Sequence, residues 1–140
     1  MSPITIRAKL LIQELWKELF ERDEQLPQNV QGTWLEISKD IQESVKAAFP
    51  RCYFNEYKNT KTAKNTLHIF TDASLKAYGA VAYLCNGNES QIVIAKTKVA
   101  PLKPLTLPQL ELMGIVIGAR LASHLKYAFN DTIHEVEHLV

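Results

Sequence analysis

The sequence has few cysteines and no long apolar run, and both absences narrow its class. Cys52 and Cys85 are its two cysteines. Two are too few for a disulfide framework and predict a reduced, intracellular protein in the cytoplasm or nucleus. No stretch of 18 apolar residues is available to span a membrane. The N-terminal segment carries basic residues within its apolar pattern and does not look like a signal peptide, so we expect no secretion.

A strong charge of either sign is also missing. The formal net charge is +1, so only a local patch could indicate a nucleic-acid partner. Residues 51–65 form such a patch, because lysines there interleave with Tyr53, Phe54 and Tyr57. Cations and aromatic rings together suit phosphate contacts and base stacking. Charge runs are more often simply solvated, however, and we interpret residues 51–65 as a polar linker.

Two amphipathic helices are expected before this linker. Ser2 and Pro3 suit a helix start, and apolar residues then recur every three or four positions to residue 20. A second helix is expected over about 29–48, ended by Pro50. Residues 1–50 therefore form a helical segment whose wide apolar stripe needs a partner surface. The residues expected to face inward are Ile4, Ala8, Leu11, Ile12, Leu15, Leu19, Val30, Trp34, Ile37, Ile41, Val45 and Ala48.

Three strands follow the linker, at residues 66–72, 78–85 and 91–99. The first alternates apolar and polar positions, as a strand with one buried face does. The sequence Asn-Gly-Asn at 86–88 predicts a hairpin turn. Gly79, with alanines around it, leaves room for a close approach by another part of the chain. We expect an antiparallel three-stranded meander.

The last helix has the clearest start signal. Thr106 is a suitable N-cap, Pro108 lies in the first turn and Gln109 occupies the capping-box position. The helix is expected to end near Asn130. Its core stripe is Leu110, Met113, Ile117, Leu121 and Leu125, and the small residues Gly114, Gly118, Ala119 and Ala122 would let it lie close to a sheet. The order ααβββα, with a short terminal piece, predicts an α/β fold in which residues 66–140 form the second domain.

Two carboxylates stand out against their apolar neighbours. Asp72 ends an apolar strand, and Glu111 lies between Leu110 and Leu112. Taken singly, Asp72 suits a strand-end turn and Glu111 suits the first turn of a helix, where the dipole favours an acid. If the helix packs on the sheet, the two can converge. Close carboxylates need a cation between them, and Mg²⁺ or Mn²⁺ suits oxygen ligands.

The motifs FTDAS-x4-GAVAYL and LTLPQLELMG-x3-GARLA resemble the ribonuclease H domain of Bel/Pao-type retrotransposon polyproteins. The segment SPITIRAKLLIQELW, the following EQLP and Trp34 also look like the connection between reverse transcriptase and ribonuclease H in those polyproteins. The resemblance implies a ribonuclease H-like fold and two-metal hydrolysis of the RNA strand in RNA–DNA hybrids. It places Asp72 and Glu111 at the first two metal-binding, catalytic acids. The implied partners are an RNA–DNA hybrid or other nucleic acid, and the reverse transcriptase portion of a polyprotein.

The sequence departs from the family pattern after its last helix. The family's fourth strand reaches a third acid, but the segment IHEVEHLV supplies none at a matching position, and Asp131, Glu135 and Glu137 are misplaced. The fourth acid has no counterpart. We therefore expect an incomplete domain with a stunted fourth strand and no fifth, inactive by itself, such as a truncated or mispredicted reading frame would encode.

Three other interpretations compete with a nuclease. His134-Glu-Val-Glu-His138 matches the H-E-x-x-H signature of zinc peptidases. That signature requires a helix, but the surrounding stretch TIHEVEHLV is β-branched at its start and ends two residues after His138. An aspartic protease is discounted because Ala73 and Ser74, without a glycine, follow Asp72. The third alternative is a non-enzymatic remnant that binds nucleic acid or a polymerase partner. Its exposed sheet edge would favour self-association.

Overall fold

The computed structural model describes residues 2–48, 53, 64–87 and 89–139. They fall into two compact units, Met1–Phe49 and Pro50–Val140. The first holds helices α1 (Ser2–Lys17) and α2 (Gln28–Val45). The second holds strands β1 (Asn65–Ala73), β2 (Ala77–Asn86) and β3 (Glu89–Val99), helix α3 (Leu107–Phe129), a short 3₁₀ turn (Asn130–Thr132) and strand β4 (Glu135–Leu139). The predicted mixed α/β class and the element order are confirmed. The expected linker lies mostly outside the described residues, and the predicted domain boundaries stay predictions.

The helical unit buries much less of its apolar stripe than the sequence predicts. Ile37 is fully buried, whereas Trp34 and Val45, both expected to face inward, are exposed. Trp16 is 74% exposed. Two helices alone share only one narrow seam, so a wide apolar stripe on each cannot be covered by the other. An exposed ion pair, Arg7 Nη1 to Asp40 Oδ2 at 2.7 Å, links α1 to α2.

Helix α1 ends earlier than residue 20, at a Schellman motif. Leu19 adopts a left-handed conformation with φ of 58°. The Leu19 N–H donates to Trp16 O and the Phe20 N–H to Leu15 O, each at 3.4 Å. These two bonds satisfy carbonyls that the helix leaves free at its end. None of the helices in the described residues is long and apolar enough to cross a membrane.

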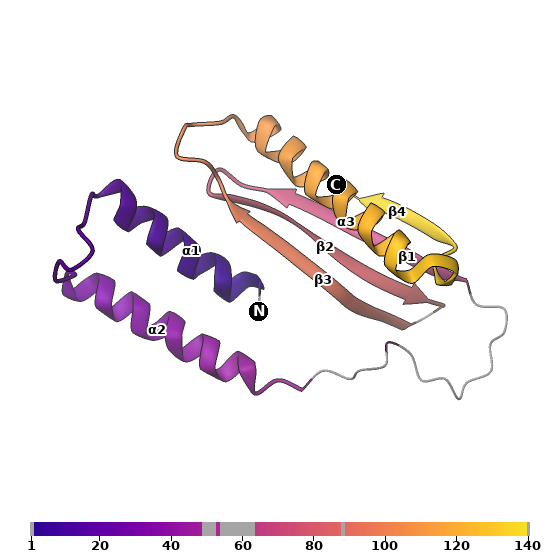
Figure 1. The fold of residues 1–140 in the computed structure, drawn as a ribbon, viewed down its shortest axis with the longest axis horizontal. Coiled ribbons are helices and arrows are strands. Elements are labelled where there is room, and N and C mark those ends of the chain that lie inside the picture. Colours follow the sequence, from indigo (N-terminus) through magenta and orange to yellow (C-terminus); the bar gives the residue numbers. More distant parts are fainter. Residues whose placement is uncertain (1, 49–52, 54–63, 88, 140) are drawn as a thin grey trace. The chain divides into compact units, whose positions relative to one another are not determined.

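The second unit is built around β1, which lies inside a sheet of strand order β3-β2-β1-β4 (Figure 1). Strands β1, β2 and β3 form the predicted antiparallel meander, and Gly87 in the β2–β3 turn has φ of +59°. Strand β4 pairs with β1 in parallel. A parallel pairing requires a crossover connection, and α3 supplies it across one face of the sheet (Figure 1).

Alternate residues of the sheet form the core beneath α3. Leu67, Ile69 and Thr71 of β1 are buried, as their spacing predicts. They belong to a layer completed by Ala80, Ala82 and Leu84 of β2 and by Leu110, Ile117, Leu121 and Leu125 of α3. Gly79 does permit a close approach, and the approaching group is the neighbouring strand. A Cβ there would lie 2.8 Å from Lys96 O.

Two glycines bring α3 close to the sheet. A Cβ at Gly114 would lie 3.4 Å from Asp72 O, and one at Gly118 would lie 2.6 Å from Thr71 Cγ2. Both were expected to allow this contact, whereas Ala119 is exposed on the solvent side of the helix. The start of α3 is fixed as predicted, because the Thr106 N–H donates to Gln109 Oε1 at 2.9 Å.

Gly118→Ala should destabilise the second unit by about 1–3 kcal/mol, because the added methyl group has no room between α3 and Thr71. The matched control is Gly32→Ala in α2, where nothing lies within 4 Å of the new Cβ. That change should stabilise its helix by about 1 kcal/mol, the usual helical preference for Ala over Gly. Thermal unfolding followed by circular dichroism measures both. Equal effects of the two substitutions would contradict the packing described here.

Candidate functional site

The two carboxylates singled out in the sequence come from β1 and α3. Asp72 lies near the C-terminal end of β1, and Glu111 lies in the second turn of α3. The Asp72 Oδ1 atom accepts a hydrogen bond from the Ala73 N–H at 2.8 Å. The turn that follows is held mainly by Ser74, whose Oγ accepts from the Lys76 and Ala77 N–H groups at 3.3 and 3.2 Å. Among the described residues, the Asp72 carboxylate accepts no other hydrogen bond, which leaves its Oδ2 atom available.

The apolar neighbours of the two carboxylates in the sequence do not bury them. Asp72 and Glu111 are both exposed. Asp72 alternates with buried Thr71 and so belongs to the opposite face of β1. Leu112, next to Glu111, is itself 60% exposed, so both side chains reach solvent although Leu110 is buried in the core. Exposed carboxylates can coordinate a hydrated cation without first paying the cost of burial.

The packing of α3 brings the segments of both carboxylates to one end of the sheet. Gly114 touches the backbone of Asp72, and Gly118 touches Thr71 and Ile69. The helix therefore runs antiparallel to β1, and Glu111, one turn before Gly114, reaches the end of β1 at which Asp72 lies. Glu111 also precedes Gly118 by seven residues, so both lie on the flank of α3 that faces β1 and β4. The roles of Asp72 and Glu111 as metal ligands stay a prediction.

The acids that follow α3 in the chain do not lie beside Asp72. Parallel pairing sets Glu135 beside Thr66 and Glu137 beside His68. His68 is four residues from Asp72, which in a strand is about 13 Å. The side chain of Asp131 lies outside the described part of the chain. Within that part, no three His, Cys, Asp or Glu residues form a group able to hold a metal ion.

The zinc-peptidase interpretation fails on secondary structure. The signature needs both histidines on one helix, but Glu135–Leu139 is a strand. His134 precedes the strand, and its Nδ1 accepts a hydrogen bond from the Asn65 N–H at 3.3 Å. His138 lies against α3, where its Cε1 would be 3.0 Å from a Cβ at Gly118.

The aromatic linker patch is only partly described. Residues 51–52 and 54–63 lie outside the described part, so a nucleic-acid role for Phe54 and Tyr57 stays untested. Tyr53 packs its ring edge-to-face on Phe129 at 5.9 Å between centroids. This ring is thereby part of the packing around the core rather than a free stacking surface.

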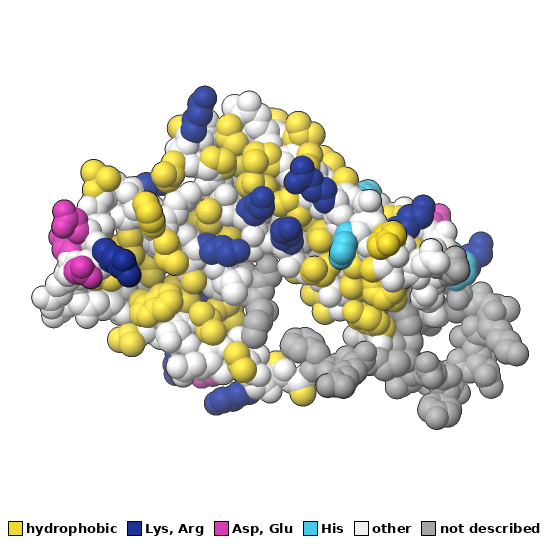
Figure 2. All heavy atoms as spheres, in the orientation of Figure 1, with side chains coloured by type: hydrophobic (Ala, Val, Ile, Leu, Met, Phe, Trp, Pro, Cys, Tyr) yellow, Lys and Arg dark blue, Asp and Glu magenta, His cyan; other side chains and the backbone are white. Residues whose placement is uncertain are grey.

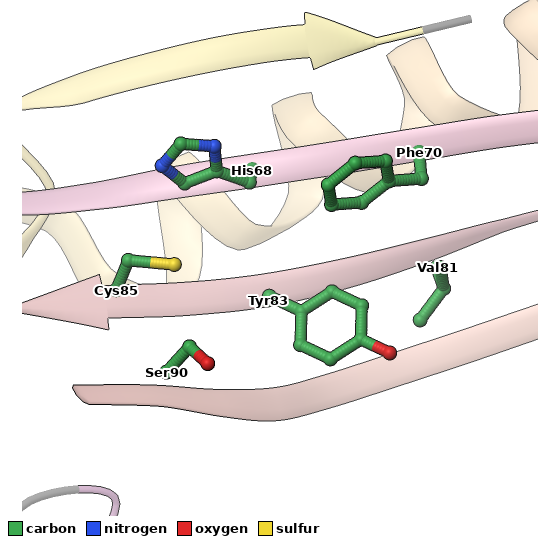
Figure 3. A pocket seen from close by; sticks show the side chains of 6 residues that line it. All are labelled: His68, Phe70, Val81, Tyr83, Cys85 and Ser90. Carbon is green, nitrogen blue, oxygen red and sulfur yellow. The ribbon is translucent and has the colours of Figure 1, made fainter. Parts of the chain in front are cut away.

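The face of the sheet opposite α3 carries an open hollow that sequence reasoning did not identify. Figure 3 shows its lining side chains on one side of the strands, with α3 behind them. They are His68, Phe70, Val81, Tyr83, Cys85 and Ser90. Phe70 and Tyr83 form an edge-to-face pair at 5.9 Å, and His68 Nδ1 lies 3.2 Å from Glu137 Oε2. Alternation in β1 could have indicated this face, but the pairing that brings Glu137 to it could not be read from the sequence.

Cys85 lies at one end of this hollow. Burial raises its pKa, and the negative charge of Glu137 raises it further. A raised pKa leaves less of the thiolate, the form that attacks electrophiles. The hollow therefore has no activated nucleophile at Cys85.

In a Cys52→Ser background, Cys85 should react with iodoacetamide at pH 8 more slowly than a free cysteine. Glu137→Gln should lower the thiol pKa and speed the reaction, because it removes the neighbouring charge. Glu135→Gln on the same strand is the control and should leave the rate unchanged. The pH dependence of alkylation measures both pKa values, and a rate unchanged by Glu137→Gln would contradict the assignment.

Comparison of the sequence with known proteins identifies the family to which the chain belongs. None of the curated proteins compared with the sequence matches it. A family model described as the Pao retrotransposon-like RNaseH-like domain matches residues 1–139. The match covers nearly the whole chain, and the mixed sheet with α3 across one face agrees with a ribonuclease H-like fold. The chain therefore belongs to the Pao retrotransposon-like RNaseH-like domain family.

Proposed function

We propose that this chain derives from a retrotransposon ribonuclease H, an enzyme that hydrolyses the RNA strand of RNA–DNA hybrids. Family membership supports a nuclease-related origin. The observation that carries the proposal is the contact between α3 and β1 at Gly114 and Asp72, since it sets Glu111 at the same end of the sheet as Asp72. Such hybrids form inside cells, which agrees with the expected intracellular location.

Asp72 and Glu111 are the proposed metal-binding residues. Their oxygen atoms are the donor type that Mg²⁺ and Mn²⁺ prefer. When bound, a pair of such ions would activate water and stabilise the charge that develops on the phosphate. Asp72, anchored by its bond to the Ala73 N–H, would hold an ion in a fixed position at the end of β1. Glu111 would contribute a second carboxylate from the helix.

Two carboxylates are a weak site, and we propose that the 140-residue chain does not cleave hybrids by itself. Support comes from the register of β4, which keeps Glu135 and Glu137 far from Asp72. The same observation favours the second candidate, a non-enzymatic fragment that binds nucleic acid or the polymerase portion of a polyprotein. Strand β4 is short and forms an edge of the described sheet, so self-association through it belongs to this second candidate.

A thermal-shift titration with Mn²⁺ tests the metal site. At a tenfold excess over the dissociation constant, binding to the folded state should add about 1.4 kcal/mol of stability. Asp72→Asn and Glu111→Gln should each abolish the shift, and the exposed control Asp23→Asn should retain it. A shift that persists in Asp72→Asn would remove this residue from the site.

The two candidates differ in a cleavage assay. With a labelled RNA–DNA hybrid and Mn²⁺, the chain should release no RNA fragments, since two carboxylates hold the metal pair poorly. Gel electrophoresis of the labelled RNA measures this, and RNase-free Asp72→Asn protein controls for contamination. Cleavage that depends on Asp72 would show that the chain is a working nuclease.

A further inference from the structure

Strand β3 presents two lysines on the side of the sheet that α3 covers. Lys98 pairs with Tyr78 and Lys96 with Ala80, and both partners are buried beneath α3. Paired residues of neighbouring strands point to the same face. Because β3 is an edge strand of the described sheet, α3 does not cover it, and both lysines are exposed. They lie about 6.6 Å apart along the strand.

Helix α3 adds one further cation, Arg120, on the flank that faces these lysines. Met113 packs against the core cluster around Tyr78 and Ala80, so its flank is turned toward β2 and β3. Arg120 follows Met113 by seven residues and lies on the same flank, exposed. Tyr127 follows by seven more and is 86% exposed. We call Lys96, Lys98 and Arg120 the β3–α3 basic surface. Figure 2 shows Lys and Arg side chains, in dark blue, gathered over α3 and β3.

The β3–α3 basic surface has no acidic partner among the described residues. The ion pairs among the described residues join Arg7 to Asp40 and His68 to Glu137, and neither involves this surface. The acids of the second unit whose side chains are described lie elsewhere. They are Glu111 on the opposite flank of α3, Glu135 and Glu137 on β4, Glu89 at the far end of β3, and Asp72 on the other face of β1. Three cations without counter-ions repel one another unless an anion binds between them.

We propose that the β3–α3 basic surface binds the phosphate backbone of a nucleic acid, and that this nucleic acid is the hybrid substrate. The identification of this nucleic acid as the hybrid substrate rests on the proposed function. A row of point charges suits a repeating polyanion, and exposed Tyr127 offers a ring for stacking at the end of the row. The strand that carries the lysines lies two strands away from Asp72, whose side chain is on the opposite face of the sheet. Asp72 pairs with Gly79, and Gly79 with Thr97, between the two lysines. Two strand spacings, about 10 Å, separate Thr97 from Asp72.

Fluorescence anisotropy with a labelled RNA–DNA hybrid tests the surface, in EDTA so that no metal contributes. The variant Lys96→Gln, Lys98→Gln, Arg120→Gln should bind at least tenfold more weakly at physiological salt. Its slope of log affinity against log salt should fall by about three, one for each lost phosphate contact. The control removes three exposed cations elsewhere, Lys39→Gln, Lys46→Gln and Lys126→Gln. It should keep most of the affinity and the slope, and circular dichroism verifies both folds.

The outcomes separate this inference from the proposed function. Equal losses in the two triple variants would overturn the inference, since net charge alone would then explain binding. Failure to bind the hybrid while heparin or an acidic protein binds would also overturn it. If the unmodified chain shows no thermal shift with Mn²⁺, while the triple variant of the basic surface still weakens hybrid binding, the proposed metal site alone is refuted.

Discussion

The close contact between α3 and β1 is the packing interaction on which the second unit depends. At Gly118 the helix approaches β1 until a methyl group would lie 2.6 Å from Thr71 Cγ2. That proximity lets Leu110, Ile117, Leu121 and Leu125 bury themselves against the alternating apolar residues of β1 and β2. It also decides the direction and depth of the helix. Glu111 therefore reaches the end of β1, while Arg120 stays on the open flank beside β3.

The position of β4 follows from the same contact. Since α3 crosses one face of the sheet, the chain re-enters on the far side of β1 and pairs in parallel, in the register that sets Val136 beside Leu67. Val136 joins the core there, and Glu137 points to the opposite face beside His68. The same packing arrangement thus sets Glu111 at the end of the sheet where Asp72 lies and sets Glu137 beside His68 at the hollow opposite α3.

Charged residues of opposite sign lie on different elements of the second unit. A formal net charge of +1 conceals cations on β3 and α3 and acids on β4. Lys96 and Lys98 also blunt an edge strand whose middle, Ile92 to Ile94, is apolar and β-branched. The same two lysines can therefore discourage edge-to-edge pairing and attract a polyanion, with no conflict between the roles.

Local sequence patterns specify the helices, strands and turns of this protein. Alternation at 66–72, the Asn-Gly turn at 86–87 and the capping residues Thr106 and Gln109 each specify backbone geometry within a few residues. The motifs around Asp72 and Glu111 were enough to indicate the family. Only tertiary packing set the solvent exposure of both carboxylates and the register of β4. Those features depend on contacts between segments far apart in the chain, and side-chain spacing within one segment carries no information about them.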